Sequence, residues 1–230
     1  GINFRQSMYA QNTVQDLEDL PTVWGGYDKL PLQSKYFLKA GYPITAMSGK
    51  FHTAWGEFGG FKHPNALRYE AASMIAWGAN CNFGDQLHPC GEMDVATYKN
   101  IGEAYAYVAK IENYAVGGTP VARVGLWRSL DETSDEGMAK MLLEAHINFD
   151  VANFSQDFAE FELVLIPSVA CLTESDAQRL NAFAKNGGSL VVMGAGALNR
   201  EGTRMLLDVG ADYLGEARYD VDYSLVSNPV

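Results

Sequence analysis

Two short and almost uninterrupted apolar runs constrain the fold of this chain most. They cover residues 161–167 and 189–194, and both are apolar at successive positions, as strands buried on both faces of a parallel sheet require. Between them, Thr173 and Asp176 form a capping-box pattern that opens a helical segment ending at Lys185, before two glycines. Because parallel strands need a crossover that is usually helical, this order predicts a βαβ unit.

The rest of residues 117–230 continues the alternation. Strands are predicted over 121–127 and 149–154, and helices over 135–147 and 203–209. The first of these helices should turn Met138, Met141, Leu142 and Ala145 inward. Parallel strands with helices on both faces indicate a flavodoxin-like domain of the class I amidotransferase type. Its turn at 193–197 reads MGAGA and offers no nucleophile, so we expect this part to be non-catalytic.

A change of pattern at residues 117–120, GGTP, divides the chain. A helical pattern ends there and an apolar strand begins, which places the predicted domain boundary between 1–116 and 117–230. In the first part we predict strands over 2–10, 43–47 and 80–83, a long connection from residue 13 to 39, and helices over 33–40 and 66–79. A last helix, capped by Asp94, should bury Tyr98, Ile101, Tyr105 and Val108.

Polar and aromatic residues of this first part concentrate just after predicted strands. In a (β/α) barrel, the carboxyl ends of the strands carry the active site. A whole barrel takes roughly 250 residues, so residues 1–116 can supply only some of its strands, and we expect the later ones. The predicted fold class is therefore α/β, with part of a barrel followed by a flavodoxin-like parallel-sheet domain.

Composition excludes several classes of partner and cofactor. The formal net charge is −11, without clustered Lys and Arg, which argues against nucleic acid. Cys81, Cys90 and Cys171 form no CxxC or His-interleaved pattern, so we expect no metal site; a Cys81–Cys90 disulfide stays open, with reduced thiols as the default. No apolar run approaches the ~20 residues of a membrane span, and no secretory leader is visible. The chain starts without Met, as a processed form or a piece of a longer protein would, so the compartment stays open with the cytoplasm slightly favoured.

The stretch 49–89 gathers groups suited to binding or cleaving a sugar. Carboxylates can exchange protons, indole faces can stack on sugar rings, and glycines let the backbone approach a ligand. Each group also has an ordinary alternative role, as an exposed loop carboxylate, a loop-stapling residue or a core aromatic ring. Their clustering favours a site; the candidates are His52, Trp55, Glu57, Asp85 and His88, with Glu18 and Trp24 upstream.

Four segments carry a resemblance to a known family. They read EDLP at 18–21, WGGY at 24–27, GKFHTAWGEFGG at 49–60 and GDQLHP at 84–89. Together they resemble the family 151 glycoside hydrolases, the α-L-fucosidase-like proteins once called hypothetical glycosyl hydrolase 6. Residues 117–230, including YDVDY at 219–223, resemble the β-galactosidase trimerisation domain.

The resemblance implies retaining hydrolysis of a terminal α-L-fucoside by an Asp nucleophile and a carboxylic acid/base. In related fucosidases the nucleophile follows the fourth barrel strand, which would precede Gly1, so the chain is expected to be an inactive fragment of an active glycosidase. We expect Glu18 to lie in a loop that resembles the one bearing the acid/base in family 29 fucosidases, and Glu57 is the alternative.

Further expectations concern the ligand and the assembly. From their residue types, Trp24, His52, Trp55, Asp85 and His88 are the candidates for sugar binding, and we expect no cofactor, no metal, and no nucleic acid or membrane partner. The resemblance implies a carbohydrate substrate and a homotrimer in the intact protein. Two alternatives stay open: a β-galactosidase-like glycosidase, and a non-catalytic carbohydrate-binding or assembly protein.

Overall fold

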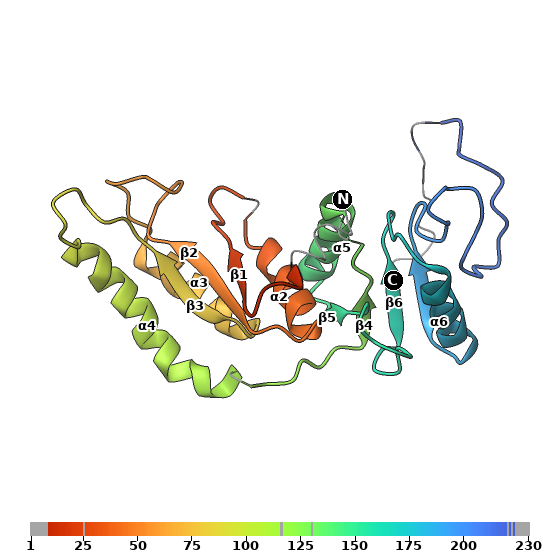
Figure 1. Cartoon of the computed structure of the whole chain (residues 1–230), viewed down its shortest axis with the longest axis horizontal. Coiled ribbons are helices and arrows are strands. Elements are labelled where there is room, and N and C mark those ends of the chain that lie inside the picture. The colour runs from red at the N-terminus through yellow and green to blue at the C-terminus, as the bar shows by residue number, and fades with distance from the viewer. Residues whose placement is uncertain are drawn as a thin grey trace.

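The protein is a mixed α/β molecule with two parallel sheets, placed one after the other along its long axis (Figure 1). A computed structural model describes residues 9–24, 26–115, 117–129, 131–219, 221 and 223. The predicted strand over 2–10 lies outside these residues except for its last two positions. Within the described ranges, no helix is both long and apolar enough to span a membrane.

The first sheet contains β1 (Gln15–Glu18), β2 (Ile44–Gly49) and β3 (Asn80–Gly84), in the order β1-β2-β3. The strands predicted over 43–47 and 80–83 are confirmed. The segment that became β1 was predicted to be connecting chain, and this was wrong, because a strand of sequence QDLE shows little apolar alternation of its own. Its pairing with β2, in which Glu18 lies opposite Met47, makes it a strand. Glu18 therefore ends a strand rather than lying within a loop.

Three helices accompany this sheet: α2 (Lys29–Lys39), α3 (Pro64–Ala76) and α4 (Val95–Ala115). α2 begins four residues before the predicted start, since a proline such as Pro31 costs no hydrogen bond in the first turn of a helix. α3 begins after His63, whose ring Nδ1 accepts a hydrogen bond from the Asn65 amide at 3.2 Å. Asp94 caps α4 as predicted, by accepting from the Ala96 amide at 2.9 Å.

The buried stripe of α4 differs from the predicted one. Tyr98 and Tyr105 are 42% and 40% exposed, whereas Thr97 and Ala104 are buried together with Ile101 and Val108. The small side chain of Ala104 faces a cluster of apolar residues on α3. The Tyr105 ring instead contacts Phe83 of β3, and its hydroxyl donates to the Cys81 carbonyl at 3.2 Å. All three cysteines are free thiols.

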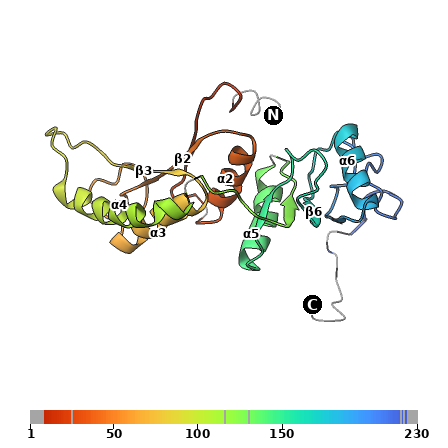
Figure 2. The same cartoon turned by 90° about the horizontal axis from the view of Figure 1, so that it is seen from below.

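In the part of the chain that the structure describes, helices cover one face of the first sheet and leave the other face without them. Figure 2 shows α3 and α4 on the same side of β2 and β3. Successive strand residues point to opposite faces. Accordingly Leu17, Ile44 and Ala46 are buried on the helix side, and Asp16 and Glu18 are exposed on the other.

The second sheet has the strand order β5-β4-β6-β7, all parallel, formed by β4 (Val124–Leu126), β5 (Phe149–Val151), β6 (Leu163–Ile166) and β7 (Ser189–Val192). Helix α5 (Glu132–Glu144) follows β4, and α6 (Glu174–Lys185) follows β6. The predicted capping box of α6 is confirmed. β6 is buried as predicted, but β7 is an edge strand with Val191 45% exposed, because no described strand pairs beyond it.

Two other predictions for this part were wrong. In α5, Ala139 is buried, while Met141 is 57% exposed and Ala145 is also exposed, because the inward stripe is rotated toward Asp135, Met138 and Leu142. Residues 203–209 form no helix. The Asn199 side chain accepts hydrogen bonds from the backbone amides of Thr203 and Arg204, at 2.8 and 3.0 Å, and a bridge joins Leu198 to Met205. These contacts hold the chain in a turn.

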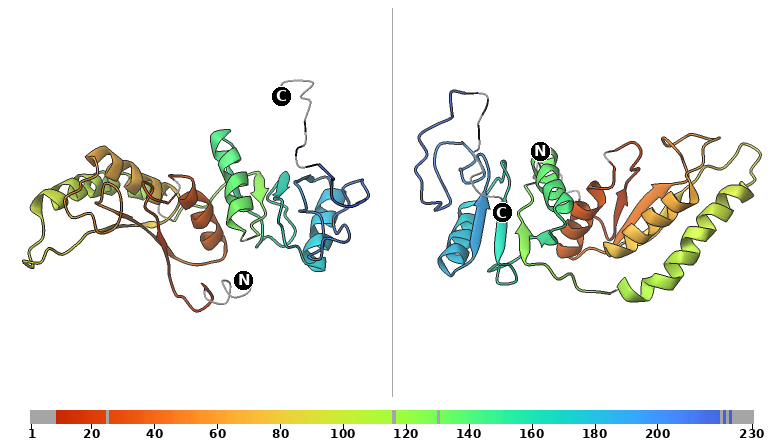
Figure 3. Two further views of the ribbon diagram at one scale, coloured as in Figure 1. Left: turned by 90° about the horizontal axis from the view of Figure 1, so that it is seen from above. Right: turned by 180° about the vertical axis from the view of Figure 1, so that it is seen from behind.

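One hydrophobic cluster extends across both sheets. It combines Leu17 and Ile44 of the first sheet with Phe149 and Val151 of the second. Helix α2 lies between the sheets and contributes Tyr36, Phe37 and other residues to the cluster (Figure 3). The first sheet is thus anchored against the second through a helix that belongs, in sequence, to the first part.

Candidate functional site

Three loops meet at the carboxyl edge of the first sheet. They follow β1, β2 and β3 and extend from the same end of the sheet (Figure 1). The Thr22 hydroxyl donates to the Thr53 carbonyl at 3.0 Å and joins the first loop to the second. The rings of Phe58 and His88, 5.6 Å apart, join the second loop to the third. The three loops that carry most of the candidate residues therefore contact one another.

Trp55 lies across the ends of two strands. Its ring occupies the space above Gly84, where a Cβ atom would overlap it, and a Cβ on Gly49 would come within 3.1 Å of it. The Phe51 ring meets the indole edge-on at 5.1 Å. The indole N–H is buried and has no hydrogen-bond acceptor among the described residues. Because Gly49 and Gly84 have no side chains, the flat Trp55 ring can lie against the sheet edge. Its indole N–H is the donor without a partner among the described residues.

Asp85 directly follows β3 and carries unused acceptors. Both of its carboxylate oxygens are buried without a well-formed hydrogen bond to any described residue, and so is the side-chain oxygen of Gln86. Burial raises the pKa of the nearby Tyr98 hydroxyl, and the negative charge of Asp85 raises it further. A buried acceptor without a donor costs about 1–3 kcal/mol. These oxygens can accept hydrogen bonds from hydroxyl or amide groups of a ligand.

Glu57 holds its own loop together. Its Oε2 accepts a hydrogen bond from the Thr53 amide at 2.6 Å, and its carboxylate packs against the backbone of Gly60. The hydrogen bond from Thr53 lowers the pKa of Glu57. A general acid must keep its proton near neutral pH, so this environment suits a structural carboxylate better than an acid.

Glu18 has different surroundings. It is exposed on the helix-free face of the sheet and lines a cavity of about 170 Å³ together with Gln33 and Arg128. Trp24, in the following loop, is 39% exposed, and the Lys29 ammonium lies 5.5 Å from its ring centroid. His52 is exposed in the second loop. Trp24 and His52 both lie at the rim of the candidate site.

A buried polar network under the loops was not predicted. Lys62 and Glu70 are only 2% and 3% exposed, and the Lys62 ammonium donates to both carboxylate oxygens of Glu70, at 3.0 and 2.9 Å. Ser48, at the end of β2, receives a hydrogen bond from Lys62 at 2.8 Å and donates to Glu70 at 2.7 Å. Tyr27 also donates to Glu70, at 3.4 Å. The sequence feature that could have indicated this network is Glu70, a carboxylate on the otherwise apolar face of α3.

Asp19 adjoins this network and gives a testable pH dependence. It is 3% exposed, its Oδ1 has no partner among the described residues, and burial is the main cause that raises its pKa to about 6. Because the pKa is higher in the folded than in the unfolded state, the folded state binds the proton more tightly. The contribution of Asp19 to stability is then fully present below pH 4 and is lost as the pH rises to 6, by about 3 kcal/mol for a shift of two units.

Asp19→Asn is therefore expected to stabilise the chain relative to wild type at pH 7 but not at pH 4. Urea unfolding of both proteins across this range measures the difference, and comparing the two cancels the titration of the other carboxylates. A difference that does not change with pH would contradict the assignment.

Among the described residues, no three His, Cys, Asp or Glu side chains are placed to hold a metal ion.

Comparisons with known proteins agree with the sequence resemblance. Residues 139–215 match the family model of the β-galactosidase trimerisation domain. The α-L-fucosidase isoenzyme 2 from Paenibacillus thiaminolyticus is 40% identical, with a TM-score of 0.79 over 88% of this chain. The cold-adapted β-galactosidase from Rahnella sp. R3 shares the fold at 18% identity, with a TM-score of 0.62 over 82% of the chain. A search of curated proteins found no match.

The chain spans about a third of these solved structures, 33% of the fucosidase and 34% of the galactosidase. The match to the fucosidase covers both sheets, because it extends over most of the 230 residues. The resemblance predicted from the sequence, to α-L-fucosidase-like glycoside hydrolases with a β-galactosidase trimerisation domain, is therefore confirmed.

Proposed function

We propose that the chain forms one side of the active site of a retaining α-L-fucosidase-like glycoside hydrolase. The observation that carries this proposal is the 40% identity to an α-L-fucosidase over 88% of the chain. The site adds chemical support, since it combines an aromatic surface on Trp55, the unsatisfied acceptors of Asp85 and the exposed carboxylate of Glu18 at one sheet edge. Sugar sites combine such aromatic faces with a few polar groups.

The proposal includes the domain organisation. Residues 1–116 would supply later strands of a (β/α) barrel, with the helix-free face of the first sheet lining its interior. The arrangement of helices on one face and exposed polar residues such as Asp16 on the other supports this. Residues 117–230 would form a flavodoxin-like domain. In support, the order β5-β4-β6-β7 corresponds to the start of the flavodoxin order 2-1-3-4-5.

Glu18 is proposed as the acid/base. In the first step it would protonate the glycosidic oxygen while an Asp outside these 230 residues attacks the anomeric carbon and the aglycone leaves. In the second step it would take a proton from the water that displaces the enzyme carboxylate from the sugar. Its position at the end of a strand, on the helix-free face, suits this role. Glu57 suits it less, because its carboxylate is engaged by Thr53.

The remaining candidates would bind the sugar. Trp55 would contact the sugar ring and Asp85 would accept from its hydroxyl groups, with His88 held beside Phe58 at the same edge. Trp24 and His52 would contact the substrate from the rim. The match to a trimerisation domain supports assembly of the intact protein as a homo-oligomer, which we propose to be a trimer.

A panel of 4-nitrophenyl glycosides tests this function. With the full-length protein that carries these residues, we expect release from the α-L-fucoside and not from the β-D-galactoside. The match to the β-galactosidase trimerisation domain favours the galactoside as the second candidate, so preferred cleavage of that substrate would replace the proposal. The 230-residue chain alone should cleave neither glycoside. Cleavage by this chain would contradict a nucleophile outside it, and no cleavage by the full-length protein would favour a non-catalytic binding protein.

A further inference from the structure

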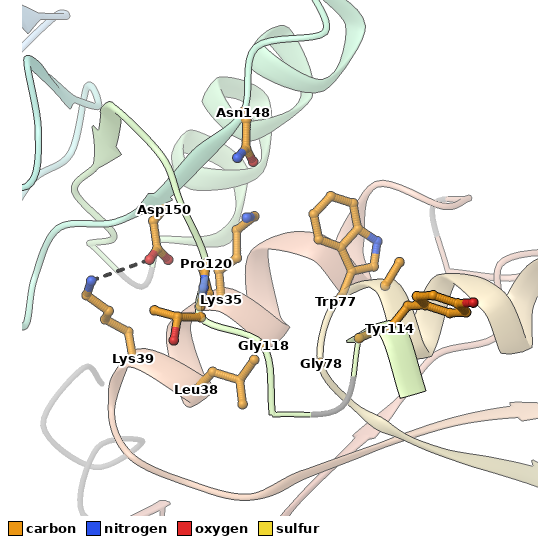
Figure 4. A pocket seen from close by; sticks show the side chains of 13 residues that line it. Lys35, Leu38, Lys39, Trp77, Gly78, Tyr114, Gly118, Pro120, Asn148 and Asp150 are labelled. Carbon is orange, nitrogen blue, oxygen red and sulfur yellow. Dashed lines mark hydrogen bonds and ion pairs between the residues drawn. The ribbon is translucent and has the colours of Figure 1, made fainter. Parts of the chain in front are cut away.

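A cavity of about 470 Å³ lies away from the three loops, where α2 and α3 end and β5 begins (Figure 4). The loops lie at the carboxyl edge of the first sheet, and helices that return after parallel strands end at the opposite edge. None of the residues that line this cavity belongs to the loops. Its volume lies within the range of small-molecule sites. It is therefore separate from the candidate active site.

Lys35 of α2 is the unusual residue of this cavity. It is only 7% exposed, and its ammonium lies 4.9 Å from the Trp77 ring centroid and 5.2 Å from that of Phe149. It makes no hydrogen bond and no ion pair with any residue in the described part of the chain. An ammonium group has three donors, and a buried cation is normally paired and hydrogen-bonded. Contact with aromatic faces offsets only part of this cost.

Three other polar side chains of the cavity, those of Lys39, Asn148 and Asp150, are already engaged. Lys39, one turn further along α2, lies 3.4 Å from Asp150 and 3.3 Å from Glu160. The second carboxylate oxygen of Asp150 accepts from the Val151 amide at 2.8 Å. Asn148 donates to the Val121 carbonyl at 2.6 Å. Lys39 is thus shared by two carboxylates, Asp150 and Glu160, whereas Lys35 makes no direct contact of this kind with a described residue.

The walls next to Lys35 are apolar and aromatic. Trp77, Leu38 and Pro120 line the cavity beside the ammonium group (Figure 4). Burial lowers the pKa of Lys35, and the charge of Asp150 partly opposes this. A bound anion would provide the acceptors that the ammonium lacks, and a ring or short carbon chain would cover the indole. The cavity therefore combines the Lys35 ammonium, which can bind an anion, with the flat apolar face of Trp77, which can contact a ring or carbon chain.

We infer that this cavity binds a carboxylate-bearing molecule about the size of a monosaccharide, with the carboxylate on Lys35 and the body of the molecule against Trp77. The inference goes beyond the proposed hydrolysis and does not depend on it, because the two sites share no residue. The charge that selects the ligand is Lys35, and the apolar walls select against small inorganic anions.

Isothermal titration of the 230-residue chain with D-glucuronate, D-galacturonate and D-glucose tests this inference. We expect saturable binding of at least one of the two sugar acids, and binding of glucose that is at least tenfold weaker. Lys35→Met keeps the apolar stem and removes the charge, so it should weaken binding of the sugar acid by about 10- to 100-fold, as expected for a charge-assisted hydrogen bond. The matched control is Lys140→Met, on an exposed lysine outside the cavity, which should bind as wild type does.

Folding of the variant can be checked separately. Lys35→Met removes an unpaired buried charge, so its melting temperature without ligand should equal or exceed that of the wild type. Three results would overturn the inference: neither sugar acid binds, a folded Lys35→Met binds the sugar acid as tightly as the wild type, or glucose binds as tightly as the acids. The last result would show that the carboxylate is not recognised.

Discussion

Glu18→Gln in the full-length protein is expected to lower kcat/KM for unactivated α-L-fucosides by about 10²- to 10⁴-fold, the usual contribution of general acid–base catalysis. The amide keeps the shape of the side chain at the end of β1 and cannot protonate the leaving oxygen. Substrates with poor leaving groups need that proton most. The loss should therefore be smaller for 4-nitrophenyl α-L-fucoside, whose leaving group departs without full protonation. Steady-state kinetics on both substrates measures the difference.

Glu57→Gln is the matched control. Its amide oxygen can still accept from the Thr53 amide, so the second loop should keep its conformation and the activity should stay near that of the wild type. If Glu57→Gln abolishes turnover and Glu18→Gln does not, the two roles are reversed. An equal loss on both substrates in Glu18→Gln would indicate a binding or structural role instead.

Lys62→Met is expected to destabilise the chain by about 3–5 kcal/mol, because it leaves the Glu70 carboxylate buried without its cation. Lys62 and Glu70 are almost fully buried, and their contact joins the second loop to α3. Urea unfolding of the 230-residue chain at pH 7 measures the loss. Arg123→Met is the control, since the Arg123–Glu162 pair is exposed and such pairs contribute at most about 1 kcal/mol.

The double variant Lys62→Met/Glu70→Leu sharpens this test. It removes both charges and leaves apolar side chains of similar size, so it should recover much of the stability lost in the single variant. If Lys62→Met costs less than 1 kcal/mol, or if the second substitution adds a further loss, the network does not have the buried, paired character that the structure shows.

Periodicity predicted the parts of the fold that local pattern determines. The helix capped at Thr173 and the buried strand β6 have the expected places, because their apolar periods and caps lie within a few consecutive residues. β1 was missed because its pairing with β2, rather than its sequence, makes it a strand. The turn at 199–205 was missed for a related reason, since the side chain of Asn199 outweighs a helical pattern.

For the site too, local sequence pattern predicted some features and missed those that depend on tertiary contacts. Alternation of strands and helices was enough to predict that Trp55, Asp85 and His88 gather at one sheet edge. This alternation could not show that Glu57 accepts a hydrogen bond from the Thr53 amide, or that Lys62 and Glu70 form an ion pair beneath the loops. Both contacts depend on the path of the loop between residues 50 and 63. The roles of Glu18 and of the sugar-binding residues stay predictions.

The hydrophobic cluster that α2 shares with both sheets has a consequence for how this chain can be divided. Tyr36 and Phe37 complete the core beside β5, so the second sheet depends on a helix that precedes it by about a hundred residues in the sequence. A cut at the glycines near residue 117 would expose apolar surface on both pieces. The part that contains the second sheet is thus not an interchangeable module: transplanting it onto another protein would require carrying α2 along, and the two parts should gain and lose their order cooperatively.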